Sequence, residues 1–163
     1  MRSSEADAPV LVIGYGNVLR GDDGAGPAAA EALRDQLPQP VAKILAVPQL
    51  LPELVEPLSR SKLAIFIDAD WKTPAGQLRK KKLTPSHDDG GAMGHHQSPE
   101  SLLSMASEVY GHAPPAVLFK VGGADFGFQQ GLSGPVRHAM PQLVREVVDA
   151  VINAIESQER LHA

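Results

Sequence analysis

Two short, uninterrupted apolar runs constrain the fold of this chain more than any other feature of its sequence. They occupy Val10–Ile13 and Leu63–Ile67, and the first is followed by a glycine and the second by an aspartate. A strand with water on one face alternates apolar and polar residues, whereas a parallel strand covered by helices on both faces reads as a continuous apolar run. Both runs are therefore predicted to be central strands of a parallel sheet.

Segments with helical spacing of apolar residues separate the predicted strands. Residues 25–36 carry alanines and Leu33 at this spacing, with a proline in the first turn, and Pro38 ends the pattern. Another strand is predicted over 41–47 and a short amphipathic helix over 48–59. This βαβαβ order indicates a doubly wound α/β domain, with a mostly parallel twisted sheet of about five strands sandwiched by helices.

The second half of the chain supplies the remaining predicted elements. Four consecutive basic residues mark an edge strand, because charge on an edge discourages pairing with other chains. A helix begins at Ser98-Pro99, where serine suits the cap and proline the first turn. The predicted edge strand, last central strand and long closing helix occupy 76–83, 116–121 and 132–155.

Length and composition limit the classes of protein to consider. With 163 residues the chain fits one domain spanning 1–163, and residues 1–8 and 157–163 are expected to be flexible tails. A net charge of −4 argues against a nucleic-acid partner. The lack of cysteine excludes a thiolate nucleophile and iron–sulfur ligation, and no apolar run approaches bilayer length. We therefore expect a cytoplasmic protein with no membrane partner.

Acidic side chains follow both central strands. Asp22 and Asp23 come in the loop after the first strand, and Asp68 directly follows the second. The carboxyl ends of parallel strands meet at one edge, where carboxylates and a histidine could together hold nickel or zinc. Asp22 is predicted to cap the helix that follows it, with support of the metal-binding residues as the alternative. Asn17 is predicted to stabilise the turn through its side chain, with contact to a substrate as the alternative. His95 and His96 lie shortly before the helix that begins at Ser98-Pro99.

Three motifs together resemble a known family. They are Gly14-x-Gly-Asn17-x-Leu19-Arg-Gly-Asp22-Asp23-Gly-x-Gly26, Phe66-Ile-Asp68-Ala69, and a His-x-x-Ser-Pro helix start at His95. In this order and spacing they resemble the nickel-iron hydrogenase maturation endopeptidases, and the resemblance extends from Leu11 to about Ala154.

The resemblance implies a peptidase of the aspartic type that activates a hydrogenase by processing it. Its partner would be a nickel-iron hydrogenase large-subunit precursor, from which it removes a C-terminal extension after nickel incorporation. Asp23, Asp68 and His95 would be the catalytic residues and would bind the metal, with the nickel supplied by the substrate. The nickel could polarise the scissile carbonyl or activate water, or it could position the peptide while a carboxylate transfers a proton.

Other possibilities follow from the same residues. His96 could replace His95 as the ligand after a small loop shift. A non-proteolytic nickel-binding assembly chaperone would use identical ligands. A flavin- or nucleotide-binding module would suit the predicted sheet, but Leu19 replaces the third glycine of such a turn, and the Asp22-Asp23 pair would repel a phosphate. Of the oligomeric states, a monomer is the expected one.

Overall fold

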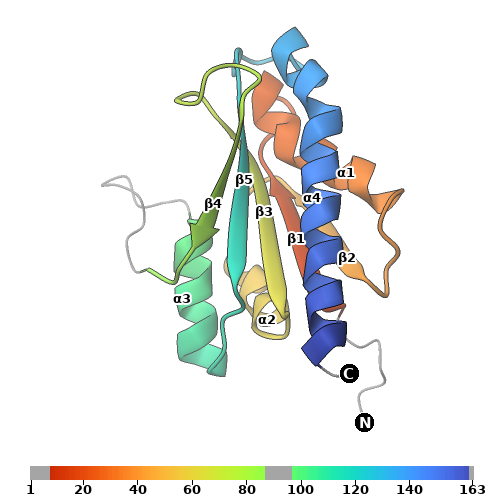
Figure 1. Ribbon diagram of the computed structural model, residues 1–163. Coiled ribbons are helices and arrows are strands. Elements are labelled where there is room, and N and C mark those ends of the chain that lie inside the picture. Colours follow the sequence, from red (N-terminus) through yellow and green to blue (C-terminus); the bar gives the residue numbers. More distant parts are fainter. Residues whose placement is uncertain (1–7, 87–96, 162–163) are drawn as a thin grey trace.

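The computed structural model describes residues 8–86 and 97–161 of the chain. Five strands form one sheet in the order β2-β1-β3-β5-β4, with helices on both faces (Figure 1). The elements, with η for a 3-10 helix, are β1 (Val10–Tyr15), η1 (Gly21–Gly24), α1 (Ala25–Arg34), β2 (Ala42–Val47), η2 (Pro52–Leu54), α2 (Val55–Ser59), β3 (Leu63–Asp70), β4 (Leu78–Leu83), α3 (Pro99–Tyr110), β5 (Ala116–Gly122) and α4 (Gly134–Leu161). The predicted single α/β sheet is confirmed.

The topology explains why ligand groups can gather between β1 and β3. The parallel strand β1 lies between β2 and β3, so the chain moves to one side of β1 to form β2 and to the other side to form β3. The next parallel strand, β5, pairs with β3, and β4 is the antiparallel edge strand that the basic residues predicted. In such sheets the crevice for ligands opens outside the carboxyl ends of the strands where the order reverses.

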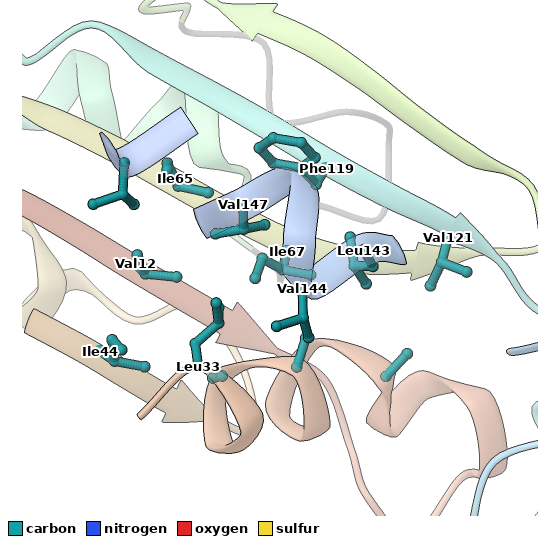
Figure 2. Packing of buried hydrophobic residues seen from close by; sticks show 14 of the residues in the cluster. Val12, Leu33, Ile44, Ile65, Ile67, Phe119, Val121, Leu143, Val144 and Val147 are labelled. Carbon is teal, nitrogen blue, oxygen red and sulfur yellow. The ribbon is translucent and has the colours of Figure 1, made fainter. Parts of the chain in front are cut away.

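Side chains alternate between two apolar layers, one on each face of the sheet. Helices α1 and α4 cover one face, where Ile65 and Ile67 of β3 and Phe119 of β5 pack against Leu33 and Leu143 (Figure 2). The other face is covered by α2 and α3. Because both faces of the central strands are buried, nearly every residue of β1 and β3 is apolar, which is the pattern visible in the sequence.

Some element boundaries differ from those predicted. The region 48–59 forms only η2 and the five-residue α2, because Pro52 lacks an amide hydrogen and restricts the residue before it. Strand β3 continues two residues beyond Asp68. Helix α4, which was predicted to end at Ile155, continues to Leu161. Residues 157–161, predicted to belong to a tail, are therefore helical. None of the helices within the described residues is long and apolar enough to cross a membrane.

Candidate active site

Close backbone contact places the loop after β1 over the carboxyl ends of the strands. A Cβ atom added to Gly14 of β1 would collide with the carbonyl group of Gly26 in α1. One added to Gly26 would in turn collide with the carbonyl oxygen of Ile67 in β3. The first turn of α1 therefore lies directly against β1 and β3, and η1, with Asp22 and Asp23, sits at the edge of the sheet just before it.

Hydrogen bonds within the loop orient the Asp23 carboxylate. The backbone N–H of Asn17 donates to Oδ2 of Asp23 over 2.6 Å, and Oδ1 of Asn17 accepts from the N–H of Leu19 over 2.9 Å. The second bond confirms that the Asn17 side chain stabilises the turn. Gly16 has a φ of +145°, and a Cβ there would collide with the backbone carbonyl of Asp23. The glycine at this position therefore lets the loop fold closely over the Asp23 backbone.

Strand alternation places three further polar groups on one face at the same edge. Along β1 the side chains on the α2 and α3 face end with Tyr15, and along β3 Asp68 follows Phe66, the last apolar side chain on this face. Asp68 pairs in register with Lys120 of β5. The side chains of Tyr15, Asp68 and Lys120 therefore follow the apolar layer outward and lie beside one another where the sheet meets solvent.

Asp68 is held in a largely buried environment. Its Oδ1 accepts from the backbone N–H of Ala69 over 2.8 Å, and the carboxylate also accepts from the Tyr15 hydroxyl. Burial raises the pKa of Asp68 to about 7, and the nearby charge of Asp23 acts in the same direction, whereas these hydrogen bonds and the charge of Lys120 oppose the rise. The Asp68 carboxyl therefore gains and loses its proton near neutral pH, as expected of a general acid–base group or of a metal ligand in the absence of the metal ion.

The Tyr15 hydroxyl joins the two carboxylates electrostatically. Burial raises the pKa of Tyr15 well above its ordinary value, and the negative charges of Asp68, Glu100 and Asp23 raise it further. The hydroxyl therefore stays protonated and donates to Asp68. The sequence analysis missed both Tyr15 and Glu100. Tyr15 could have been found from the alternation of β1, whereas only tertiary contact brings Glu100, in the first turn of α3, to this edge.

Lys120 supplies the positive charge of the site. Its Nζ lies 3.4 Å from Oδ2 of Asp70, and the side chain also attracts the carboxylate of Asp68, its partner in register. A cation beside an acid favours the ionised form of that acid. Lys120 therefore limits how far burial can raise the pKa of Asp68.

Asp22 does not cap the following helix, so that prediction is wrong. The side chain makes no capping hydrogen bond at η1 or α1 and is fully buried. Its Oδ2 accepts from the N–H groups of Ala124 and Asp125 and from Oγ of Ser133, and its Oδ1 accepts from the N–H of Ser133. Burial alone would raise the pKa of Asp22, but these hydrogen bonds outweigh it and hold the pKa below its ordinary value.

An apolar groove of about 490 Å³ opens beside the loop that carries Asp23. Its walls come from the loop after β1, the first turns of α1, the end of β2 and residues 131–132. Asn17, whose N–H donates to Asp23, lines this groove together with Val18 and Leu19, which are 55% and 53% exposed. The groove is thus lined by the loop that holds the Asp23 carboxylate, and it offers apolar surface to a ligand.

Two of the three predicted ligands lie at the same edge of the sheet and influence each other electrostatically. Asp23 and Asp68 both act on the Tyr15 hydroxyl, and the charge of Asp23 raises the pKa of Asp68. His95, like the alternative His96, lies outside the described residues. Within residues 8–86 and 97–161, no group of three or more histidine, cysteine, aspartate or glutamate side chains is arranged to hold a metal ion. Two carboxylates at one edge of the sheet suit a hard or borderline cation that brings its other ligands with it.

Comparison with known proteins gives similarities in structure alone. No family model matches the chain, and no curated protein sequence matches it. The hydrogenase maturating endopeptidase HybD from E. coli superposes with a TM-score of 0.71 and 21% identity, covering 89% of this chain and 93% of that one. The NiFe hydrogenase maturation protease HycI from Thermococcus kodakarensis superposes with a TM-score of 0.72 and 20% identity, covering 92% and 96%.

A third solved structure is somewhat more similar in sequence. The hydrogenase 2 maturation peptidase from a Thaumarchaeota archaeon is 27% identical, with a TM-score of 0.67, and the match covers 87% of this chain and 97% of that one. In each case the match extends over nearly the whole of both chains. The fold of this chain is therefore that of the hydrogenase maturation endopeptidases, as its three sequence motifs predicted.

Proposed function

We propose that this protein is an endopeptidase that removes the C-terminal extension of a nickel-iron hydrogenase large-subunit precursor after nickel incorporation. One observation carries the proposal: Asp23 and Asp68 lie together where the strand order reverses, in a chain that shares its fold with proteins named as hydrogenase maturation proteases. The proposal includes action in the cytoplasm as a monomer. The reaction is hydrolysis, in which water adds to the scissile carbonyl, the C–N bond breaks, and a carboxylate and an amine are formed.

The nickel belongs to the substrate in this proposal. Asp23, Asp68 and His95 bind it as it arrives on the precursor, and its positive charge favours the ionised form of the Asp68 carboxyl. Because the pKa of Asp68 is about 7, the empty site carries less than its full negative charge at neutral pH. A precursor without nickel would leave the Asp68 carboxyl partly protonated. The Asp23 and Asp68 carboxylates would therefore distinguish the nickel-loaded precursor from the nickel-free one.

The apolar groove beside Asp23 is the proposed place for the peptide next to the scissile bond. Val18 and Leu19 are exposed large apolar side chains on its wall, and such surface on a protein commonly marks a binding site. The N–H of Asn17 links this wall to the Asp23 carboxylate. A peptide in the groove would thus lie against the loop that holds one of the two metal-binding carboxylates.

Cleavage of a precursor, followed by mass spectrometry, tests the proposal. The protein is incubated with nickel-loaded and with nickel-free large-subunit precursor, and loss of the C-terminal extension is measured. Asp23→Ala, Asp68→Ala and His95→Ala are expected to abolish trimming of the loaded precursor, and His96→Ala to retain it. Asp35→Ala, at an exposed acid just after α1, is the matched control and is expected to cleave normally.

The other outcomes distinguish the alternatives. Binding of the precursor without trimming would favour the assembly chaperone. Absence of binding together with the yellow absorbance of a flavin would favour a cofactor-binding module. Trimming that proceeds equally without nickel would contradict recognition of the metal by Asp23 and Asp68.

A further inference from the structure

The Asp22 carboxylate is an unusual buried charge in this domain. It is the one acidic or basic side chain among the fully buried polar residues of the described chain, at 0% exposure. Four hydrogen bonds of 2.7 to 3.0 Å reach it, from donors that lie 102 to 111 residues later in the sequence. A buried carboxylate without hydrogen-bond partners would strongly destabilise the folded state. The four donors therefore hold the Asp22 carboxylate firmly in its position.

Backbone hydrogen bonds join the same two segments in both directions. The N–H groups of Gly21 and Asp22 each donate over 2.8 Å, to the carbonyl groups of Gln129 and Asp125, and the N–H of Gln129 donates back to Leu19 over 3.1 Å. The loop between β5 and α4 is therefore bound along residues 19–22. The Asp22 carboxylate lies inside this junction and the Asp23 carboxylate lies outside it.

The two candidate metal-binding carboxylates depend on different supports. Asp68 belongs to β3, and pairing with β5 fixes its backbone. Asp23 belongs to the four-residue helix η1, and the hydrogen bond that it accepts from Asn17 comes from the same loop. That one bond does not by itself fix the orientation of η1 relative to the sheet. Asp22 is the adjacent residue in the same 3-10 turn, so its anchor to the β5–α4 loop sets the orientation of that turn.

We propose that Asp22 is a positioning residue that holds Asp23 at the correct distance from Asp68 by anchoring η1 to the loop between β5 and α4. This inference rests on the proposed function, since it assigns Asp22 a part in the same site. Asp22 touches neither substrate nor metal. It acts through the short backbone connection to Asp23, as residues that orient the ligands of a metal site commonly do.

Asp22→Asn tests the positioning with minimal change of shape. The amide keeps one acceptor oxygen, but its NH₂ group then faces an N–H donor, either that of Ser133 or those of Ala124 and Asp125, so the anchor is weakened without a cavity. We expect kcat for trimming of nickel-loaded precursor to fall by about tenfold or more, with KM within about threefold of the wild type. Ser133→Ala removes only the Oγ donor, and its kcat is expected to lie between those of the wild type and Asp22→Asn.

Two controls separate positioning from general loss of stability. Val151→Ala truncates a fully buried residue in the second half of α4 and lowers the free energy of unfolding. It is expected to leave kcat unchanged at about room temperature, where the protein stays folded. Asp35→Asn removes one exposed carboxylate and is also expected to leave kcat unchanged. Wild-type kcat in Asp22→Asn, or an equal loss in Val151→Ala, would overturn the proposal.

A second readout does not depend on cleavage. The residue before Asn17 is tied to the sheet, because the N–H of Gly16 donates to the carbonyl of Val47 in β2 over 3.1 Å. The backbone N–H of Asn17 donates to Asp23 over 2.6 Å, so its proton resonance reports the position of the Asp23 carboxylate relative to this end of the sheet. In Asp22→Asn this resonance is expected to move upfield as the bond lengthens, and in Val151→Ala it is expected to stay. If the wild type cleaves no precursor, the proposed function fails while the amide shift still decides the positioning. An unmoved Asn17 resonance in Asp22→Asn would refute it.

Discussion

Replacing Asp68 with asparagine is expected to stabilise the protein at neutral and alkaline pH while destroying its proposed site. The pKa of Asp68 is raised from 3.8 to about 7. The folded state therefore binds this proton more tightly than the unfolded chain does. The resulting stability is fully present below the unfolded pKa and is lost as the pH rises through the folded value.

The magnitude follows from the two pKa values. They differ by about 3, and each unit corresponds to about 1.4 kcal/mol, so ionised Asp68 costs the folded state up to about 4 kcal/mol above pH 7. Asparagine avoids this cost, because its oxygen can accept from the N–H of Ala69 and its amide can donate to the Tyr15 hydroxyl oxygen. Between pH 5 and pH 8 the advantage of Asp68→Asn should grow by about 2 to 3 kcal/mol.

Urea unfolding of the wild type and Asp68→Asn, in the presence of a chelator, measures this difference. Comparing the two proteins at each pH cancels the titration of the other carboxyl groups. Asp35→Asn, at an exposed acid, is the matched control for the loss of one charge. An advantage of Asp68→Asn that stays the same between pH 5 and pH 8 would refute the argument that burial of this carboxyl dominates its free energy.

Three further perturbations test the packing and charge of the site. Gly14→Ala would place a methyl group 2.6 Å from the carbonyl carbon of Gly26, so α1 must move from β1, and thermal unfolding should reveal a loss of at least about 3 kcal/mol. Leu143→Ala, in the layer between α4 and the sheet, should cost about 2 to 5 kcal/mol in urea unfolding, with m unchanged. Lys120→Met removes the positive charge beside Asp68, and NMR titration of the Asp68 carboxyl carbon should give a pKa above the wild-type value.

Local sequence patterns were sufficient to predict most of the fold. The apolar runs over Val10–Ile13 and Leu63–Ile67 became β1 and β3 because burial on both faces leaves no position for a polar residue. The proline-containing segment 48–59 was predicted less well. The spacing of its apolar residues suits a helix, but the prolines shorten that helix. The free-energy cost of a proline depends on tertiary packing, which the spacing of apolar residues does not describe.

Candidate residues at the strand ends were also predictable, because β1 and β3 must deliver their carboxyl ends to one edge. Asp23 and Asp68 do lie together there, with His95 still a prediction outside the described residues. Tyr15 was missed, although the alternation of side chains along β1 could have identified it as a site residue. Glu100 could not have been identified in this way, since its position depends on how the first turn of α3 packs against the sheet.

Asp22 separates the features that follow from local sequence patterns from those that depend on contacts between distant segments. The strands, the burial of the central ones and the acidic loop could be predicted from the sequence alone, because these features depend on neighbours within a few residues. The sequence also made Asp22 look like a helix cap. Its actual hydrogen-bond donors lie more than one hundred residues later in the chain, in the loop before α4. Only the folded sheet brings those donors to Asp22, since no local pattern encodes a partner at that separation.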